Sequence, residues 1–463
     1  MRFFDSLSPL RSLRLGGEIC CEKRGSETVS ILLDIAYGAG LAAASPYLAF
    51  KLLTDRRWRG GVGQRFGRIP AREGDAPCVW FHGPSVGEIL AAKPLVTMLK
   101  ERMPEWDVAI STTTPEGRAQ AEKRYGNHPF LFPMDLTCTV GRALDRIRPD
   151  CVVLMERDLW PNFLSLLGKR GIPVLVANGI VSESMVRRFR LLNRFFGGTG
   201  ARRTLEEIAA FCVQSELYAS RLEDLGLARE KICVTGSMKY DSLRDSFPPE
   251  KQAALRKLLQ LEERDWLLVA GSTHPGEEQA VLDAFAKLRR KYDNLRLVIV
   301  PRHINRAAEV ERAIAEKGYP SFRKTTLDAG GVEAGALKDA VVVVDTIGDL
   351  LGFYSIASAA FVGGSLTDRG GQNMLEPVAL GVPTLFGPHV KNFQDSADLL
   401  LAADGAKTVR DTYELTVTLD FLRDNPVKSA DMALRGREAV TSRRGATEKT
   451  LEKLLALLPI KHT

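Results

Sequence analysis

The chain of 463 residues is poor in the residue types that bind metals. Its seven cysteines are scattered, and several lie in apolar runs, as free cysteines do in a reducing cytosol. Its six histidines never take metal-ligand spacing, and neither CxxC nor HExxH occurs. We therefore expect no zinc site, structural or catalytic.

A strong excess of charge is also missing. Basic residues number 64 and acidic residues 57, a net charge of +7, and 26% of all residues are charged. This modest excess does not indicate nucleic-acid binding, and the composition is that of an ordinary globular protein. The length allows two or three domains of roughly 100–200 residues each.

An uncharged run long enough to cross a membrane is missing as well. Within the apolar segment 29–53, the uncharged part from Ile35 to Phe50 would form a helix of about 24 Å, shorter than a hydrocarbon core near 30 Å. Extension back across Asp34 reaches spanning length at the cost of a charge. An interfacial helix, a true span and a buried core helix stay open for this segment.

Charge and composition on either side of this segment bear on its orientation. Residues 1–28 have mixed charge and do not resemble a signal peptide, so they form a leader of unknown role. The segment 29–53 is followed by basic residues that favour a cytoplasmic location for the rest of the chain, namely Arg56, Arg57, Arg59, Arg65, Arg68 and Arg72.

From Cys78 onward, short β-rich runs alternate with amphipathic helical stretches. This rhythm predicts a parallel sheet covered by helices on both faces. It pauses in the polar, proline-containing stretch from Lys239 to Gln252 and then starts again. We therefore predict a first α/β domain over 54–242 and a second over 243–463, the second including the closing helix.

The most informative stretch is glycine-rich and runs from Gly363 to Glu376. A β-rich run, Ala359 to Val362, leads into it, and it ends in a helix whose first turn carries Glu376. Glycines permit close approach of a ligand, free N–H groups at a helix start attract an anion, and a carboxylate there can accept hydrogen bonds from a ribose. The pattern predicts a nucleotide site, and its spacing fits neither GxGxxG nor GxxxxGK[ST].

Several motifs together resemble the Kdo transferases, which transfer 3-deoxy-D-manno-octulosonic acid (Kdo) in lipopolysaccharide synthesis. Besides the glycine-rich stretch, the resemblance rests on HGPSVGE from His82, GSTHPGEE from Gly271, PRH from Pro301 and GPHVKNF from Gly387. These enzymes are GT-B glycosyltransferases. The resemblance implies two Rossmann-like parallel-sheet domains facing a cleft, with an N-terminal membrane-associated helix.

In the first half, three residues carry the implied catalysis. Glu88 of SVGE corresponds to the family's proton acceptor, although on spacing alone it could merely complement a helix dipole. Glu156, in MERDLWPN, ends another strand, but Arg157 and Asp158 replace the Thr and Glu typical of the family. Lys239, in GSMKYD, would steady the departing phosphate or the donor's carboxylate.

In the second half, the resemblance implies a site for CMP-linked Kdo. Arg302 follows an apolar strand and suits bidentate phosphate binding. Asp349 replaces a common glutamate, and NGIVSE stands where NARLS is typical, which leaves the contact near Gly179 open. The implied donor-binding residues are Ser272, Pro301, Arg302, His303, Ile347, Gly348, Asp349, Asn373, Met374, Leu375 and Glu376.

The implied reaction is transfer of Kdo to a lipid A precursor with inversion, without metal or other cofactor, on the cytoplasmic face of the inner membrane. A second basic run, Met185 to Phe196, fits a phosphorylated acceptor and a membrane surface, or else is a solvated helix face. Two alternatives remain: a GT-B enzyme that acts on a UDP-sugar, as a transferase or 2-epimerase, and a non-catalytic membrane scaffold.

Overall fold

The computed structural model describes residues 61–459 except 127 and 196–199, together with positions 34–35, 37–40, 42–43, 45–46, 50 and 54. The expected leader, residues 1–28, and much of the segment 29–53 lie outside the described residues. Within the part of the chain that is described, no helix has both the length and the apolar character needed to cross a membrane. The chain divides into two compact units, Met1–Ser242 with Arg444–Thr463, and Leu243–Arg443.

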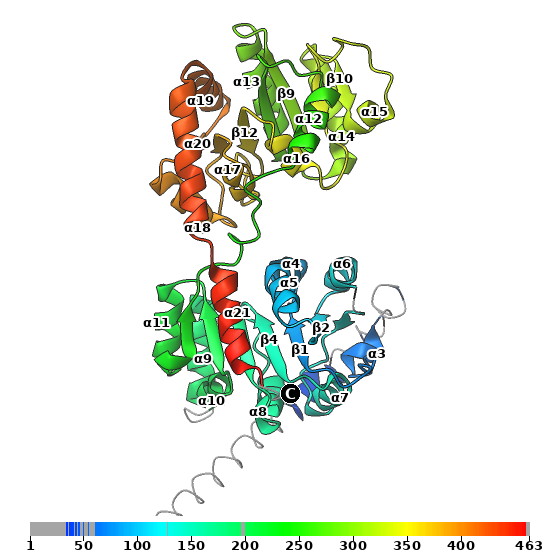
Figure 1. Cartoon of the computed structure of the whole chain (residues 1–463), viewed down its shortest axis with the longest axis vertical. Helices are drawn as coiled ribbons and strands as arrows, with labels where there is room; N and C mark the ends of the chain where they lie inside the picture. The colour runs from blue at the N-terminus through cyan, green and yellow to red at the C-terminus, as the bar shows by residue number, and fades with distance from the viewer. Residues whose placement is uncertain are drawn as a thin grey trace, which may run out of the picture. The chain divides into compact units, whose positions relative to one another are not determined.

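The first unit contains a parallel seven-stranded sheet in the order β3-β2-β1-β4-β5-β6-β7 (Figure 1). Its strands are β1 (Cys78–His82), β2 (Asp107–Thr112), β3 (Phe130–Leu131), β4 (Cys151–Met155), β5 (Val174–Gly179), β6 (Ala210–Val213) and β7 (Ile232–Val234). Its helices are α3 (Val62–Arg65), α4 (Val86–Ala91), α5 (Lys93–Arg102), α6 (Pro115–Tyr125), α7 (Thr137–Ile147), α8 (Pro161–Lys169), α9 (Glu183–Phe195), α10 (Gly200–Glu206), α11 (Glu216–Asp224) and α21 (Ala446–Leu457).

Alternation along these strands builds a core on each face of the sheet. Trp80 and Val152 belong to one buried cluster, which α7 and α8 cover, while Val79 and Val153 belong to the other, which α5 and α21 cover. Since successive side chains of a strand point to opposite faces, strands buried on both sides become continuous apolar runs. That is why these runs were recognisable in the sequence.

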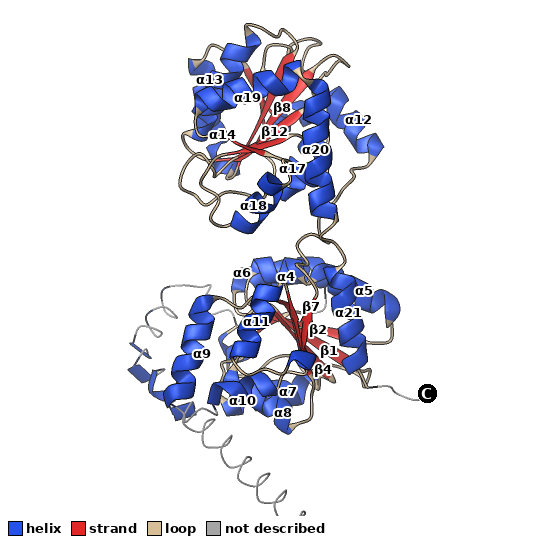
Figure 2. Cartoon of the chain, turned by 90° about the vertical axis from the view of Figure 1, so that its left-hand side faces the viewer, coloured by secondary structure: helices blue, strands red, loops and turns tan. Residues whose placement is uncertain are grey.

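The second unit repeats the architecture, with strand order β10-β11-β9-β8-β12-β13-β14. Its strands are β8 (Trp266–Thr273), β9 (Leu295–Pro301), β10 (Ser321–Arg323), β11 (Val341–Val343), β12 (Ala359–Val362), β13 (Thr384–Phe386) and β14 (Lys407–Thr408). Its helices are α12 (Pro249–Leu258), α13 (Glu277–Arg289), α14 (Ala307–Glu316), α15 (Lys324–Ala329), α16 (Leu350–Tyr354), α17 (Leu375–Ala379), α18 (Gln394–Ala402), α19 (Thr412–Asp424) and α20 (Pro426–Thr441). Helices surround both sheets (Figure 2).

The last helix differs from the sequence-based expectation, which placed it in the second domain. α21 belongs to the first unit and packs beside α5. The Asp241 carboxylate fixes its start, because it accepts hydrogen bonds from the backbone N–H groups of Gly445 (2.7 Å) and Thr447 (2.6 Å). Buried Leu451 and Leu454 complete the attachment.

Strand order fixes where a ligand can bind in each unit. In an open α/β sheet, a crevice forms at the carboxyl ends of the two strands between which the order reverses. In the first unit these strands are β1 and β4, and in the second they are β8 and β12. Glu88 and Glu156 follow the first pair, while in the second unit Ser272 lies at the end of β8 and the glycine-rich stretch follows β12. The two-domain parallel-sheet prediction is confirmed.

Candidate functional site

Glu88 lies in the first turn of α4, just beyond the carboxyl end of β1. Ser85 caps this helix, since its Oγ accepts a hydrogen bond from the backbone N–H of Gly87 at 3.2 Å. The same hydroxyl donates to Oε2 of Glu88. The helix start and its cap therefore hold the carboxylate at the sheet edge where a ligand is expected.

Glu156 directly follows β4 and has a left-handed backbone conformation, with φ 61°. Asn178, near the end of β5, also has a left-handed backbone conformation, with φ 56°. Such conformations are costly for residues other than glycine and cluster at active sites. Asn178 joins the parts of the site: its Nδ2 donates to Oε1 of Glu156 at 3.3 Å, and its Oδ1 accepts from the backbone N–H of Met238 at 3.0 Å. Lys239 is the next residue.

Electrostatics place the three predicted catalytic residues near one another. Burial first, and then the negative charge of Glu88, raise the pKa of Glu156 to about 7. Arg157, the hydrogen bond from Asn178 and the charge of Lys239 act in the opposite direction. Glu88 and Lys239 thus both act electrostatically on Glu156 within the first unit, and near neutral pH Glu156 exists in both protonation states.

A second polar chain lies beside this cluster at the end of β1. Trp80 donates from Nε1 to Oγ of Ser111 (2.7 Å), which contacts Nδ1 of His82 (2.9 Å), and Nε2 of His82 contacts Oδ2 of Asp158 (2.8 Å). Since Trp80 can only donate, the Ser111 hydroxyl is free to donate to His82. A neutral imidazole that donates from Nε2 to Asp158 satisfies every contact.

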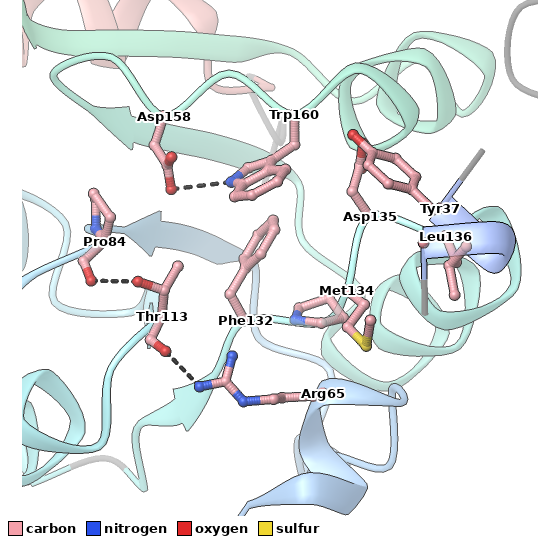
Figure 3. A pocket seen from close by; sticks show the side chains of 12 residues that line it. Tyr37, Arg65, Pro84, Thr113, Phe132, Met134, Asp135, Leu136, Asp158 and Trp160 are labelled. Carbon is pink, nitrogen blue, oxygen red and sulfur yellow. Dashed lines mark hydrogen bonds between the residues drawn. The ribbon is translucent and has the colours of Figure 1, made fainter. Parts of the chain in front are cut away.

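Asp158 and the chain around it border a cavity of about 560 Å³ in the first unit (Figure 3). Phe132 and Trp160 line it with ring planes inclined by 28° and centroids 6.0 Å apart, and Trp160 donates from Nε1 to Asp158 at 3.0 Å. Pro84, directly before the Ser85 cap of the Glu88 helix, lines the same cavity. Sequence reasoning did not predict this cavity, because its walls come from segments distant along the chain.

In the second unit, a separate cavity of about 440 Å³ gathers predicted donor-binding residues. It lies at the carboxyl ends of β8 and β9 and before α16. The predicted residues that line it are Ser272, Pro301, Arg302, His303, Ile347 and Gly348. Arg302 is exposed, so its guanidinium is available to an anionic ligand.

The other predicted donor residues do not line this cavity. The Asp349 carboxylate bonds the Thr346 hydroxyl and pairs with Lys324 at 3.4 Å, so it is engaged within the protein. The side chains of Met374 and Leu375 are buried. Asn373 donates from Nδ2 to Oε1 of Glu376 at 3.0 Å.

Glu376 keeps its predicted position in the first turn of α17. Burial raises the pKa of its carboxyl, and the hydrogen bond from Asn373 acts in the opposite direction. The negative charge of Glu376 also acts on Tyr354 of α16, whose buried hydroxyl has no hydrogen-bond partner among the described residues. The Glu376 carboxylate is therefore oriented by its hydrogen bond from Asn373, and burial leaves it only partly solvated.

We expect the anion at the free N–H groups of the helix start that carries Glu376, and that expectation stays a prediction. Earlier in the glycine-rich stretch, backbone N–H groups are engaged by the protein itself. Buried Glu277, at the start of α13, accepts hydrogen bonds from the backbone N–H groups of Gly364 (2.6 Å), Ser365 (2.8 Å) and Leu366 (2.8 Å). A side chain at Gly363 would clash with the backbone of Ser272 and Thr273. The absence of a side chain at Gly363 thus lets the loop pack against β8. The Glu277 carboxylate accepts hydrogen bonds from three of the loop's backbone N–H groups.

The basic helix α9 has one side packed against the core of the first unit and one side exposed to solvent. Met185, Val186 and Phe189 pack against the core of the first unit, whereas Arg187 and Arg188 are exposed. These three apolar residues therefore serve the core, while the exposed side carries Arg187 and Arg188 together with Leu191. Of the first basic run, Arg72 is internal: it pairs with Asp107 at 2.8 Å.

Sequence reasoning missed two residues that organise the site, Asn178 and Glu277. Asn178 had a usable signal, since an asparagine directly before a glycine at a strand end is typical of left-handed backbone. Glu277 lay within a quoted motif, but its partners are about 90 positions away along the chain, and nothing local indicates them.

Comparison with known proteins supports one family. Residues 60–242 match the family of 3-deoxy-D-manno-octulosonic-acid transferases (kdotransferases). A 3-deoxy-D-manno-octulosonic acid transferase of Chlamydophila psittaci is 32% identical over 92% of this chain and 95% of its own length. This chain belongs to the Kdo transferase family. It is therefore a glycosyltransferase that transfers Kdo.

Other comparisons agree with that assignment and with the fold. The Haemophilus influenzae enzyme of the same name is 30% identical over 86% of this chain and 91% of its own length. Among solved structures, UDP-GlcNAc 2-epimerase from Neisseria meningitidis has a TM-score of 0.56 at 15% identity and covers 82% of this chain and all of its own. This likeness shows a shared GT-B fold alone.

Proposed function

We propose that this Kdo transferase transfers Kdo from CMP-Kdo to a lipid A precursor with inversion of the anomeric centre. The observation that carries the proposal is the cluster of Glu88, Glu156 and Lys239 at the carboxyl ends of the first sheet. Two carboxylates and an ammonium suit displacement of a good leaving group by a hydroxyl. The acceptor hydroxyl attacks the anomeric carbon, CMP departs with the bonding electrons, and a base takes the proton.

Glu88 is the base in this proposal. It is held at a helix start by Ser85, and its negative charge contributes to the raised pKa of Glu156. Glu156, with a pKa of about 7, supplies a protonated carboxyl that donates a hydrogen bond to a substrate oxygen. Lys239 provides positive charge for the donor's carboxylate or the departing phosphate.

In the second unit, the cavity lined by Ser272, Arg302 and Gly348 is the proposed donor site. Arg302 pairs with the phosphate, and Glu376 accepts hydrogen bonds from the ribose diol. No metal is needed in this scheme, because arginine and lysine neutralise the charge that develops on CMP.

The proposed location is the cytoplasmic face of the inner membrane. Two observations support it: the described part of the segment 29–53 exposes Ile35 (63%) and Phe50 (61%), and α9 exposes Arg187 and Arg188. Apolar and basic side chains on one unit suit an anionic membrane surface.

The direct test is incubation of the full chain with a lipid A precursor and CMP-Kdo generated in situ, followed by mass spectrometry of the lipid product. We expect a mass increase of one or more Kdo units, and at least about a hundredfold less product in the same time with Glu88→Gln. Retention of Kdo on CMP in the presence of the lipid, with an active donor-generating enzyme, would overturn the proposal. Thermal shifts with CMP and UDP separately identify the nucleotide.

A further inference from the structure

The cavity beside Asp158 has no role in the mechanism above, although it adjoins the catalytic residues. Its lining is mostly apolar and aromatic, with Phe132 and Trp160 as walls and Met134 and Leu136 beside them (Figure 3). Pro84 connects this lining to the Ser85 cap of the Glu88 helix. A ligand in this cavity therefore reaches the vicinity of the proposed base.

The two carboxylates of the cavity are already satisfied by the protein. Asp135 accepts hydrogen bonds from the backbone N–H groups of Asn162 (3.0 Å) and Phe163 (2.8 Å), at the start of α8. Asp158 accepts from Trp160 and contacts His82. What the cavity offers a ligand is thus chiefly hydrocarbon and ring surface, which binds apolar chains.

One cation borders this apolar surface. Arg65 donates from Nη2 to the carbonyl of Thr113 at 2.7 Å, and it is the single basic residue among the described residues that line the cavity. Its guanidinium carries five N–H donors, so one hydrogen bond to Thr113 leaves others for a ligand. An apolar cavity with an arginine at its border suits an acyl chain that carries oxygen atoms at one end.

The described part of the segment 29–53 forms another wall of the cavity, through Tyr37 and Gly40. Its start is attached to the first unit, since Oδ1 of Asp34 accepts from the backbone N–H of Thr137 and from Nδ2 of Asn162, both at 3.0 Å. The same segment exposes Ile35 and Phe50. Exposed apolar side chains on a segment that also lines the cavity are consistent with entry of a ligand from a lipid phase.

We propose that this cavity binds one acyl chain of the acceptor lipid, with Arg65 bonding the carbonyl or phosphate oxygens near its attachment point. The proposal rests on the proposed function for the identity of the lipid. Phe132 and Trp160 hold the chain, and Pro84 places the sugar hydroxyl near Glu88. The cavity thus determines which acylated acceptors are used.

Binding is tested without catalysis by tryptophan fluorescence. The probe is a glucosamine 1-phosphate that carries one N-linked decanoyl chain brominated near its end, because bromine quenches an indole that it contacts. We expect saturable quenching, most of which disappears in Trp160→Phe. Met134→Tyr, which fills the cavity, should weaken probe binding at least tenfold. Leu217→Tyr, an exposed position on α11 of the same unit, should leave it unchanged.

Kinetics with acceptors of different chain length complete the test. Each methylene buried is worth about fourfold in affinity, so the acceptor KM should fall with chain length until the cavity is full. Met134→Tyr should flatten this dependence while the KM for CMP-Kdo stays constant. If Met134→Tyr melts at a lower temperature than the parent, Leu136→Tyr replaces it.

The outcomes separate this proposal from the proposed function. Quenching of Trp160 without any Kdo transfer supports the acyl site and rejects the acceptor assignment. Kdo transfer with a KM independent of chain length, and no quenching by the brominated probe, rejects the acyl site and leaves the reaction intact. Equal quenching in Met134→Tyr and the parent also rejects it.

Discussion

Asn178 donates a hydrogen bond to Glu156 at 3.3 Å, and both residues adopt a left-handed backbone at the ends of neighbouring strands. The same asparagine accepts from Met238, next to Lys239. A single amide therefore fixes one carboxylate relative to the lysine. The predictions below follow from this arrangement and from its counterpart in the second unit.

Glu156→Gln should stabilise the protein at high pH. The pKa of Glu156 is raised from its ordinary 4.5 to about 7 by burial and by Glu88. The native state therefore binds a proton more tightly than the unfolded chain. The penalty for ionising Glu156 is absent below pH 4.5, grows as the pH rises to 7, and is complete above that.

On this basis Glu156→Gln should raise the free energy of unfolding of the first unit by on the order of 2 kcal/mol at pH 8, with little effect at pH 4.5. Melting temperatures at the two pH values measure it. Glu116→Gln, which removes an exposed carboxylate on α6, is the control. If Glu156→Gln changed the melting temperature equally at both pH values, ionisation of Glu156 would not be the cause of the change.

Glu88→Gln should lower the transfer rate by roughly 10²–10⁴-fold, the usual contribution of a general base, with CMP affinity unchanged. Glu116 provides a matched control, because it too is an acidic residue in the first turn of a helix. A role in complementing the helix dipole would make the two variants alike in activity. Turnover of Glu88→Gln within a few-fold of the parent would reject its role as base.

Much of this architecture could be predicted from sequence, for a physical reason. Strands buried on both faces, such as Cys78–His82, become apolar runs, and residues at their carboxyl ends meet at one sheet edge. The proximity of Glu88 and Glu156 follows from that rule, whereas Lys239, beyond the edge strand β7, is placed through the contact of Met238 with Asn178. Pairings between distant segments do not: the hydrogen bonds that Glu277 accepts from the glycine-rich loop, and those that Asp241 accepts from the start of α21, depend on the completed fold.

Glu277→Gln should impair both stability and nucleotide binding in the second unit. A hydrogen bond to a charged group is worth about 1.5–3 kcal/mol, and Glu277 accepts three from the loop and one from the backbone N–H of His274 at 2.9 Å. A glutamine amide would also oppose an N–H donor. We expect a loss of at least about 3 kcal/mol in unfolding free energy, measured by urea titration.

The glycine-rich loop should then no longer be held against β8, so CMP affinity should fall as well. Glu316→Gln, on the exposed side of α14, should change neither quantity. Normal stability and normal CMP binding in Glu277→Gln would show that the loop holds its shape without this carboxylate.

Glu376→Ala should weaken CMP binding by at least roughly tenfold, because a ribose diol loses an acceptor worth about 1.5–3 kcal/mol. Asp349→Asn is the comparison, since its carboxylate is engaged with Thr346 and Lys324. We expect little change in CMP affinity for that variant. Calorimetric titration with CMP measures both, and an unchanged affinity in Glu376→Ala would make the glycine-rich stretch purely structural.

The exposed basic face of α9 leads to the last prediction. Arg187 and Arg188 point away from the core that Val186 and Phe189 complete, so serine at both positions should leave the fold intact. A basic side chain near an anionic surface is worth about 1 kcal/mol, roughly a fivefold change in affinity. The double variant should therefore raise the KM for the lipid acceptor at least about fivefold, with a constant KM for CMP-Kdo.

The dependence on salt concentration and a matched variant distinguish a loss of acceptor binding at α9 from misfolding of the protein. Lys123 and Arg124 form an equally exposed basic pair on α6, and serine at both should leave the acceptor KM near that of the parent. The difference between the parent and the α9 variant should shrink as ionic strength rises, because exposed charges are screened beyond about 10 Å at 0.1 M salt. Parallel losses for both substrates would indicate misfolding. No loss for either would mean that α9 presents only a solvated basic surface.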